Sequence, residues 1–389
     1  MATVLVFGVT LLAAVAFSAM ARRSVLSTAV MFLATGLIFG RTGFDIVRPG
    51  EDQLHSVAEI ALFLVLFTDG MHLRIHDARP SWRLPTRALA VGLPLTSLVI
   101  AACAWLLSDL DFVPALLLGV VLGPTDPVFA QAIIGRHHIP MRVRSLLNIE
   151  SGLNDGLALP VVVVLIEVLS DEPLHIGTLV AETLGGVALG AAIGAIYRFA
   201  IRFTMFDASP KYGRLETFAV GVVVFGAAGL TGGNEFLAAF AAGAVMSVGR
   251  ESDVDSDFDD TLAELVKLLA VVTFAAVLSP SFFVDFSLAD GAFVALALLL
   301  ARPVALVCAF VGLDLSRAER LTAYWFGPKG FASVLYALMV LEAGLADSEK
   351  IFHLAAIVVG ASIIAHSSTD VLIAKTFEPK DPSSASPST

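Results

Sequence analysis

Charged side chains are scarce in this sequence, and this scarcity excludes an ordinary soluble domain. Only 15% of the 389 residues are charged, 57% are hydrophobic, and the mean hydropathy is +0.86. A soluble domain has about a quarter of its residues charged. Apolar runs of about 20 residues recur along the chain, each long enough to cross a hydrocarbon core of about 30 Å. The runs are continuous rather than alternating, which predicts an all-α polytopic membrane protein and not a barrel.

Cysteine and basic clusters are also scarce. The two cysteines, Cys103 and Cys308, lie in apolar runs and are too few for a disulfide framework. The formal net charge is −11 and no basic patch with interleaved aromatic residues occurs, so we expect no nucleic-acid partner. The first apolar run lacks a positively charged leader and is followed by Arg22 and Arg23. We therefore interpret it as a transmembrane helix rather than a signal peptide.

The apolar runs predict thirteen transmembrane helices joined by short connections. Their expected bounds are 2–21, 24–40, 53–72, 85–107, 112–135, 143–169, 175–203, 214–231, 235–249, 260–279, 287–312, 318–343 and 350–375. We interpret residues 1–375 as a single transmembrane unit. The Pro- and Ser-rich segment 376–389 is expected to be a disordered tail.

The distribution of lysine and arginine predicts the orientation, because cytoplasmic connections are enriched in these residues. With the N-terminus outside, 18 of the 24 basic residues fall in inner connections. The exceptions are Arg41, Arg48 and Lys350 in outer connections, and Lys267, Arg302 and Lys329 inside helices. We predict a multi-pass protein of the cell membrane with its N-terminus outside and its C-terminus in the cytoplasm.

Two of the predicted helices contain a proline motif in their interior. The fifth helix contains GPTDP (Gly123–Pro127), and the twelfth contains GPKG (Gly327–Gly330). Proline removes a helical hydrogen bond, so both segments are expected to unwind near mid-membrane. The motifs are seven helices apart and run in opposite directions, which predicts two inverted repeats, helices 1–6 and 8–13, with the fifth member of each broken. Paired broken helices are typical of a transporter binding site; two unrelated kinks are the alternative.

Each break carries one charged residue that can compensate the half-helix ends. Asp126 in the first break can neutralise positive N-terminal ends, and Lys329 in the second can neutralise negative C-terminal ends. We predict that both residues act mainly in this structural and electrostatic way.

The predicted sixth helix carries polar residues on two neighbouring faces. Glu150 and Asn154 are four residues apart and share one face, while Ser151 and Asp155 share the next. Charged groups inside a bilayer are costly and persist there when they face a cavity or a partner. Arg302 in the eleventh helix is the predicted partner of Glu150, because a guanidinium stays charged when buried and pairs bidentately.

Asp155 then remains as a carboxylate without a basic partner. A proton or a monovalent cation can neutralise it, but not both at once, and such competition is the minimum requirement of an exchanger. Hard cations prefer oxygen ligands. Asn154 lies beside Asp155, and Ser151, Thr125 and water can complete the oxygen shell. Glu59 in the third helix is a further acid that could reach the cavity.

These residues resemble the monovalent cation/proton antiporter superfamily, in its electroneutral sodium/proton exchanger branch. The matching segments extend from helix five to helix twelve: GPTDP, residues 150–155, NEFLAAFAAGAVM at 234–246, ARPVALV and FGPKG. The resemblance implies a homodimer in which a core domain moves against a dimerisation domain. It also implies that Asp155 carries the cation or the proton, assisted by Ser151, Thr125 and Glu59. Electrogenic relatives have Asp-Asp where this chain has Asn154-Asp155, so the asparagine implies one proton per monovalent cation. Lys329 departs from the family pattern, in which arginine is usual.

The predicted function is therefore electroneutral exchange of Na⁺ or Li⁺ for H⁺ by alternating access, with both ions competing for Asp155. We expect no resident cofactor and no enzymatic activity; the partners are the transported ions and the lipid bilayer. Alternatives are a K⁺/H⁺ antiporter, a pH-gated cation channel, and a membrane sensor or scaffold without transport. An intramembrane protease using Asp126 and Asp155 is poorly supported, because it would need two carboxylates that share a site.

Overall fold

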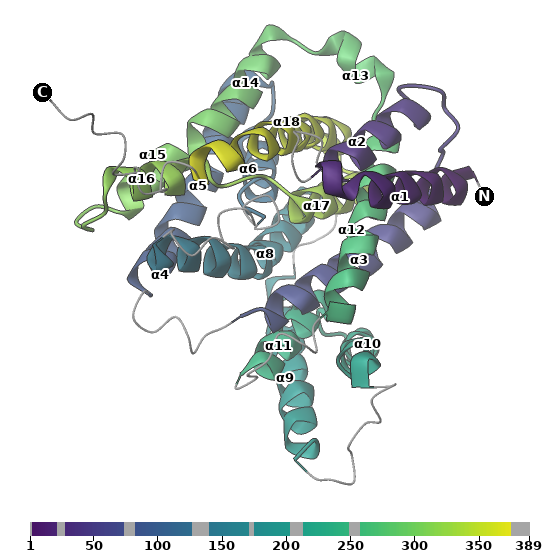
Figure 1. The fold of residues 1–389 in the computed structure, drawn as a ribbon, viewed down its shortest axis with the longest axis vertical. Helices are drawn as coiled ribbons and strands as arrows, with labels where there is room; N and C mark the ends of the chain where they lie inside the picture. Colours follow the sequence, from purple (N-terminus) through teal and green to yellow (C-terminus); the bar gives the residue numbers. More distant parts are fainter. Residues whose placement is uncertain are drawn as a thin grey trace, which may run out of the picture.

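The computed structural model describes residues 2–21, 28–73, 82–126, 140–170, 175–202, 213–248 and 257–374, and every regular element in these ranges is a helix (Figure 1). The helices are α1 (Ala2–Ala21), α2 (Thr28–Phe39), α3 (Glu51–Met71), α4 (Arg83–Arg87), the π-helix η1 (Ala88–Gly92), α5 (Leu93–Leu107), α6 (Phe112–Val121), α8 (Met141–Leu169), α9 (Ile176–Ala200), α10 (Gly213–Thr231), α11 (Glu235–Ser247), α12 (Asp257–Val277), α13 (Pro280–Asp285), α14 (Leu288–Leu299), α15 (Ala301–Ala309), α16 (Arg317–Trp325), α17 (Phe331–Glu342) and α18 (Ser348–Ala374). The all-helical prediction is confirmed.

Six stretches of the described residues are long and apolar enough to cross a membrane by length and composition. They are Asp52–Met71, Arg83–Leu107, Met141–Leu169, Gly177–Ala200, Leu288–Ala309 and Ser348–His366. Shorter apolar helices lie among them. The chain is therefore an all-helical, multi-pass membrane protein.

Prolines shape two of the predicted helices in ways that their apolar pattern did not reveal. The segment expected as one helix over 287–312 is divided at Leu300, because Pro303 clashes with the carbonyl of the residue four positions earlier. In the fourth predicted helix, Pro94 follows the π-helical turn η1 (Ala88–Gly92). The connection expected after helix ten also contains a short helix, α13, which begins at Pro280. Proline is tolerated at the first position of a helix, because an N–H group there would have no hydrogen-bond acceptor within the helix.

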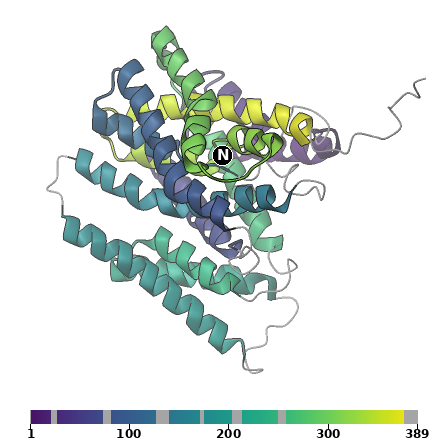
Figure 2. The same cartoon turned by 90° about the vertical axis from the view of Figure 1, so that its left-hand side faces the viewer.

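Helices α9, α10 and α11 gather at one end of the molecule, and α3 runs from them towards α12 and α17 (Figures 1 and 2). The contact of α3 with α11 is close because small residues face each other. A Cβ atom on Gly243 would lie 2.3 Å from the carbonyl oxygen of Phe67. Close backbone approach at small residues is typical of helix packing in membranes. It holds the second half of α3 beside the centre of the fold.

Helix α17 lies in the centre, between α3, α6, α8, α12 and α18 (Figure 1). Its residues from Phe331 to Leu338 are all buried, as expected for a helix that is apolar all round. Two of them, Ser333 and Tyr336, bring polar groups into this core. The packing thus places the second broken helix directly against α8, which carries Asp155.

Candidate functional site

The two proline motifs meet in the middle of the molecule. Helix α6 ends at Val121 and the chain is non-helical up to Asp126, after which residues 127–139 lie outside the described ranges. The second break separates α16 from α17. The backbone N–H of Asp126 donates to the carbonyl of Pro328 at 2.9 Å. A Cβ atom on Gly330 would lie 2.1 Å from the Cβ of Asp126, so this crossing requires a glycine.

The two charged residues of the breaks lie at half-helix ends of opposite partial charge. The Asp126 carboxylate accepts from the backbone N–H of Phe331, the first residue of α17, at 3.0 Å. The Lys329 ammonium donates to the carbonyl of Gly123, just after the end of α6, at 3.2 Å. The structure thus brings an acid to an N-terminal end and a base to a C-terminal end, which the helix dipole favours.

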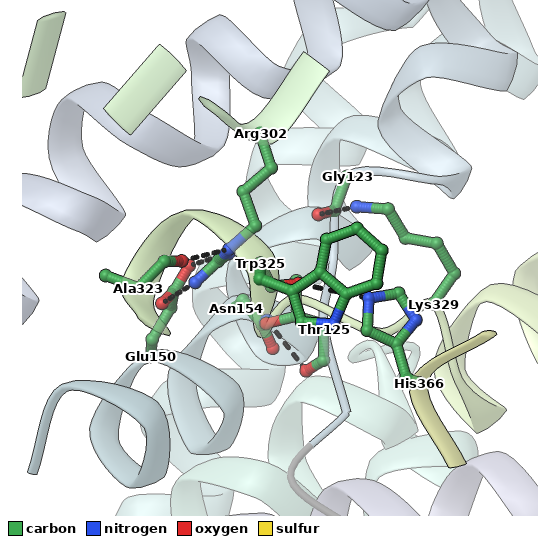
Figure 3. Close-up of polar contacts among 9 residues, drawn as sticks. All are labelled: Gly123, Thr125, Glu150, Asn154, Arg302, Ala323, Trp325, Lys329 and His366. Atoms are coloured by element: carbon green, nitrogen blue, oxygen red, sulfur yellow. Dashed lines mark hydrogen bonds and ion pairs between the residues drawn. The ribbon is translucent and has the colours of Figure 1, made fainter. Parts of the chain in front are cut away.

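Helix α18 supports the second break through His366, which the sequence analysis did not single out. One ring nitrogen of His366 lies 3.0 Å from the carbonyl oxygen of Trp325, the last residue of α16 (Figure 3). Ser362, one turn earlier in α18, accepts from the backbone N–H of Lys329 at 2.7 Å. These contacts satisfy polar groups that the end of a helix leaves without helical partners.

Glu150 and Arg302 form a bidentate ion pair between α8 and α15 (Figure 3). The two guanidinium–carboxylate hydrogen bonds are 2.7 and 2.8 Å, and both side chains are only 5% exposed. The third donor of Arg302, Nε, bonds to the carbonyl of Ala323 in α16 at 2.8 Å. This geometry satisfies the guanidinium fork in a dry environment, and it ties α8 to the half-helix before the second break.

A second Arg–Glu pair, which the sequence analysis missed, joins α8 to α16. Arg142 in the first turn of α8 pairs bidentately with Glu319 in α16. Arg142 is half exposed, unlike the buried pair. Ser316 and Glu319 also form a capping box at the start of α16. The Ser-x-x-Glu spacing was the available signal for Glu319 as a helix-start residue, but not for its partner.

Asn154 holds the first break against α8. Its side-chain N–H₂ group donates to both the carbonyl and the hydroxyl oxygen of Thr125, each at 3.0 Å (Figure 3). The amide oxygen of Asn154 has no hydrogen-bond partner among the residues that the structure describes. Buried polar atoms without a partner are rare and costly, so this oxygen is a candidate ligand.

Asp155 is buried in α8 next to α17. Its backbone carbonyl accepts from the Tyr336 hydroxyl at 2.7 Å. Its side-chain Oδ1 atom has no hydrogen-bond partner in the described part of the chain. Ser151 is buried one turn earlier on the same face of α8. On α17, the Ser333 hydroxyl is likewise buried and lacks a described partner.

The acid of α3 that lies beside Asp155 is Asp69, and not Glu59 as the sequence analysis expected. The Asp69 and Asp155 carboxyl groups lie within hydrogen-bonding reach of each other. Glu59 is ten residues earlier in the same helix, which corresponds to about 15 Å along the axis. Both acids belong to one apolar run, and its pattern gives no means of choosing between them. Only the packing of α3 against its neighbours makes the choice.

Glu59 lies instead in a separate acidic cavity of about 610 Å³. Its imidazole neighbour His55 also contacts Glu342, at 3.2 Å. Further lining residues come from α8, α11 and α17, including Glu167 and Glu235. This cavity lies towards the start of α3 and the end of α8, which is the predicted outer side.

Lys267 in α12 is a further charged residue of the Asp155 region that the sequence analysis did not include. Its ammonium lies 5.5 Å from the centroid of the Phe331 ring, a distance typical of a cation–π contact. It interacts electrostatically with Asp69, Asp155 and Asp126. The sequence analysis placed Lys267 inside a predicted helix and named no partner for it.

Comparison of this chain with known proteins supports the interpretation of this region as an ion site. The model of the transmembrane sodium/hydrogen exchanger family matches residues 8–375. The chain belongs to the sodium/hydrogen exchanger family. This is a family of transporters, so the protease alternative is set aside.

Relatives in this family carry the names of both potassium and sodium antiporters. The chain is 28% identical over 378 residues to the K(+)/H(+) antiporter NhaP of Alkalimonas amylolytica, covering 93% of this chain and 64% of that protein. It is 26% identical over 365 residues to K(+)/H(+) antiporter NhaP2 of Shewanella baltica, covering 90% and 62%. It is 27% identical over 362 residues to the probable Na(+)/H(+) antiporter C3A11.09 of Schizosaccharomyces pombe, covering 82% and 46%. The chain thus spans less than two thirds of the length of these relatives.

The fold is similar to that of a solved antiporter. Two structures of the sodium proton antiporter MjNhaP1 from Methanocaldococcus jannaschii align with TM-scores of 0.73 and 0.74 and sequence identities of 18% and 19%. The alignments cover 96% of this chain, and 96% and 97% of the two solved chains. This similarity shows a common fold.

Proposed function

We propose that this protein exchanges a monovalent cation for a proton, with both ions competing for Asp155. The observation that carries the proposal is the free Oδ1 atom of this buried carboxylate, which lies on α8 beside the crossing of two broken helices. A buried ionised carboxylate without a counter-ion is costly, so a proton or a cation stabilises it. Each ion displaces the other because both need the same oxygen atoms.

The oxygen atoms around Asp155 suit a hard monovalent cation. Ser151 lies on the same face of α8, and the amide oxygen of Asn154 has no hydrogen-bond partner among the described residues. The donor side of the Asn154 amide fixes the two oxygens of Thr125, which keeps their remaining lone pairs in a defined position. Asp69 supplies a second carboxylate. In this arrangement Asn154 acts both as a support of the first break and as a ligand.

The proposal includes the finer topology that the sequence predicts: thirteen membrane crossings, two inverted repeats and the N-terminus outside. The contact between Asp126 and Pro328 supports the repeats, because it joins the breaks of the fifth and twelfth predicted helices. With six residues, α13 is too short to cross, at about 9 Å. A homodimer with a moving core is part of the same proposal and follows from the family resemblance.

Ion flux measurements test the exchange directly. In proteoliposomes with an internal pH dye and a set proton gradient, addition of sodium or lithium is expected to move protons, whereas choline is not. The rate is expected to stay the same when an ionophore clamps the voltage at zero, because one charge replaces another. Absence of cation-driven proton movement at every pH tested would contradict the exchange and favour a sensor or scaffold. Cation flux without proton movement would favour a pH-gated channel.

Potassium is the second candidate cation, and the names of the two K(+)/H(+) antiporter relatives favour it. The sodium proton antiporter with the similar fold favours sodium, the first candidate cation. In the same proteoliposomes, proton movement driven by potassium but not by sodium or lithium would select the K⁺/H⁺ antiporter.

Asp69→Asn tests which acid of α3 serves the ion site. Loss of this carboxylate is expected to raise the half-saturating cation concentration roughly tenfold, because one nearby negative charge is removed. Glu59→Gln is expected to stay within about twofold of the native protein, since a charge about 15 Å away is largely screened. Cation titrations of proton movement measure both variants. If Glu59→Gln raised the half-saturating cation concentration and Asp69→Asn did not, Glu59 would be the acid of α3 that serves the ion site.

A further inference from the structure

The ion site contains two carboxyl groups, which changes the charge that a transported ion must neutralise. The carboxyl groups of Asp69 and Asp155 interact, and a Cβ atom on Gly152, one turn before Asp155 in α8, would lie 3.7 Å from the carbonyl oxygen of Asp69. Two ionised carboxylates would take up two protons but be only half neutralised by one monovalent cation, so the two loaded forms would differ in charge. The asparagine at position 154 therefore does not by itself produce one-for-one exchange. An electroneutral cycle therefore needs either a proton that one carboxyl group retains throughout or a fixed positive charge at the site.

Lys267 is positioned to supply that charge. It extends from α12, and its ammonium lies over the ring of Phe331, whose backbone N–H binds the Asp126 carboxylate. The ammonium interacts electrostatically with four acids, most strongly with Asp69, then with Asp126, Glu264 and Asp155. Lys267 makes no direct ion pair with a residue in the ranges that the structure describes. Its charge thus acts on both carboxylates, while the Oδ1 atom of Asp155 has no hydrogen-bond partner in the described part of the chain.

The other buried charges near the site have contacts of their own. Asp126 and Lys329 compensate half-helix ends, as described above. Two further titratable groups lie nearby. Glu264, one turn before Lys267 in α12, interacts with Lys267 and Asp126, and His72 lies close to Asp69 at the end of α3.

We propose that Lys267 is the fixed counter-charge of the ion site and sets its transport stoichiometry. With Lys267 present, Asp69 and Asp155 retain one net negative charge, which one monovalent cation or one proton neutralises. The cation-loaded and proton-loaded sites then carry the same charge, and membrane voltage does not drive the cycle. This inference rests on the proposed exchange function and adds the residue that makes the exchange electroneutral.

Removing the ammonium tests this role. Lys267→Met in proteoliposomes is expected to make cation-driven proton movement depend on the clamped voltage. The half-saturating monovalent cation concentration is expected to fall roughly tenfold, because a nearby positive charge is lost. Calcium or manganese is expected to inhibit the variant more strongly than the native protein, since two carboxylates suit a divalent cation. Lys267→Arg, which retains the charge, and Lys350→Met, which removes an exposed lysine from the surface, are expected to remain insensitive to voltage.

Two double variants identify the carboxylate that Lys267 compensates. Lys267→Met with Asp69→Asn restores one net negative charge at the site, so voltage-insensitive exchange is expected to return. Lys267→Met with Glu264→Gln leaves both site carboxylates, and voltage dependence is expected to remain. The first double variant also removes a buried charge of each sign, so it keeps the test open if Lys267→Met alone does not fold.

Three results would overturn the inference. One is voltage-insensitive exchange with unchanged cation affinity in folded Lys267→Met. Another is restoration by Glu264→Gln instead of Asp69→Asn, which would assign Lys267 to Glu264. A third is voltage dependence in the Asp69→Asn double variant. Failure of the underlying exchange function would differ from all of these, because the native protein itself would then show no cation-driven proton movement.

Discussion

Replacing Asp155 with asparagine is expected to reduce cation-driven proton movement to the level of empty liposomes. The amide keeps the size of the side chain but can neither release a proton nor neutralise a cation, so both halves of the exchange lose their shared ligand. Folding is expected to be retained, because a buried charge is removed while the Tyr336 contact to the backbone carbonyl of residue 155 remains.

Thermal unfolding gives a second readout of the same variant. A ligand at 100 times its dissociation constant stabilises a protein by about 2.7 kcal/mol. Cation-dependent stabilisation is expected in the native protein and absent in Asp155→Asn. Glu167→Gln is the matched control, because this acid lies on the same helix but in the separate outer cavity. Normal flux in folded Asp155→Asn would end the proposed mechanism.

Arg302→Ala is expected to have the largest effect on stability, destabilising the protein by about 3–5 kcal/mol because it leaves Glu150 charged and buried without its partner. Folded yield and thermal unfolding in detergent measure this loss. Arg142→Ala is the matched comparison: it also removes the arginine of a bidentate Arg–Glu pair, but Arg142 is half exposed. Its effect is expected to be about 1 kcal/mol.

A double variant separates lost pairing from an uncompensated charge. Glu150→Gln with Arg302→Met leaves no buried charge, so it is expected to be more stable than Arg302→Ala alone. Full thermal stability in Arg302→Ala would refute a structural role for the pair. Equal instability in the double variant would assign the loss to packing and to the Ala323 contact.

Much of the architecture follows from local chemistry, and so the sequence predicted it. Hydropathy indicated the helical class, and the Gly-Pro motifs indicated where α6 and α16 end. The i, i+4 spacing in α8 correctly separated the face of Glu150 from that of Asp155. The division of α14 from α15 was missed, although Pro303 was visible, because apolar periodicity does not report a break that neighbouring helices tolerate.

Local sequence patterns did not identify which charged residues lie around Asp155. Glu59 and Asp69 lie in one run, and the sequence analysis selected the acid that faces a different cavity. The sequence analysis named no partner for Lys267, yet its charge interacts with acids from α3 and α8. These positions depend on how three helices pack, and no local spacing encodes that.

The sequence by itself determined that this protein crosses a membrane as helices, where two of those helices break, and which buried acid has no obvious local partner. These properties follow from hydropathy, proline geometry and helical spacing, which act over a few residues. Only the tertiary structure decided that the breaks cross at Gly330, that Asp69 joins Asp155, and that Lys267 faces both. The reason is physical: charges distant in sequence interact only after packing brings their helices together in a medium without water.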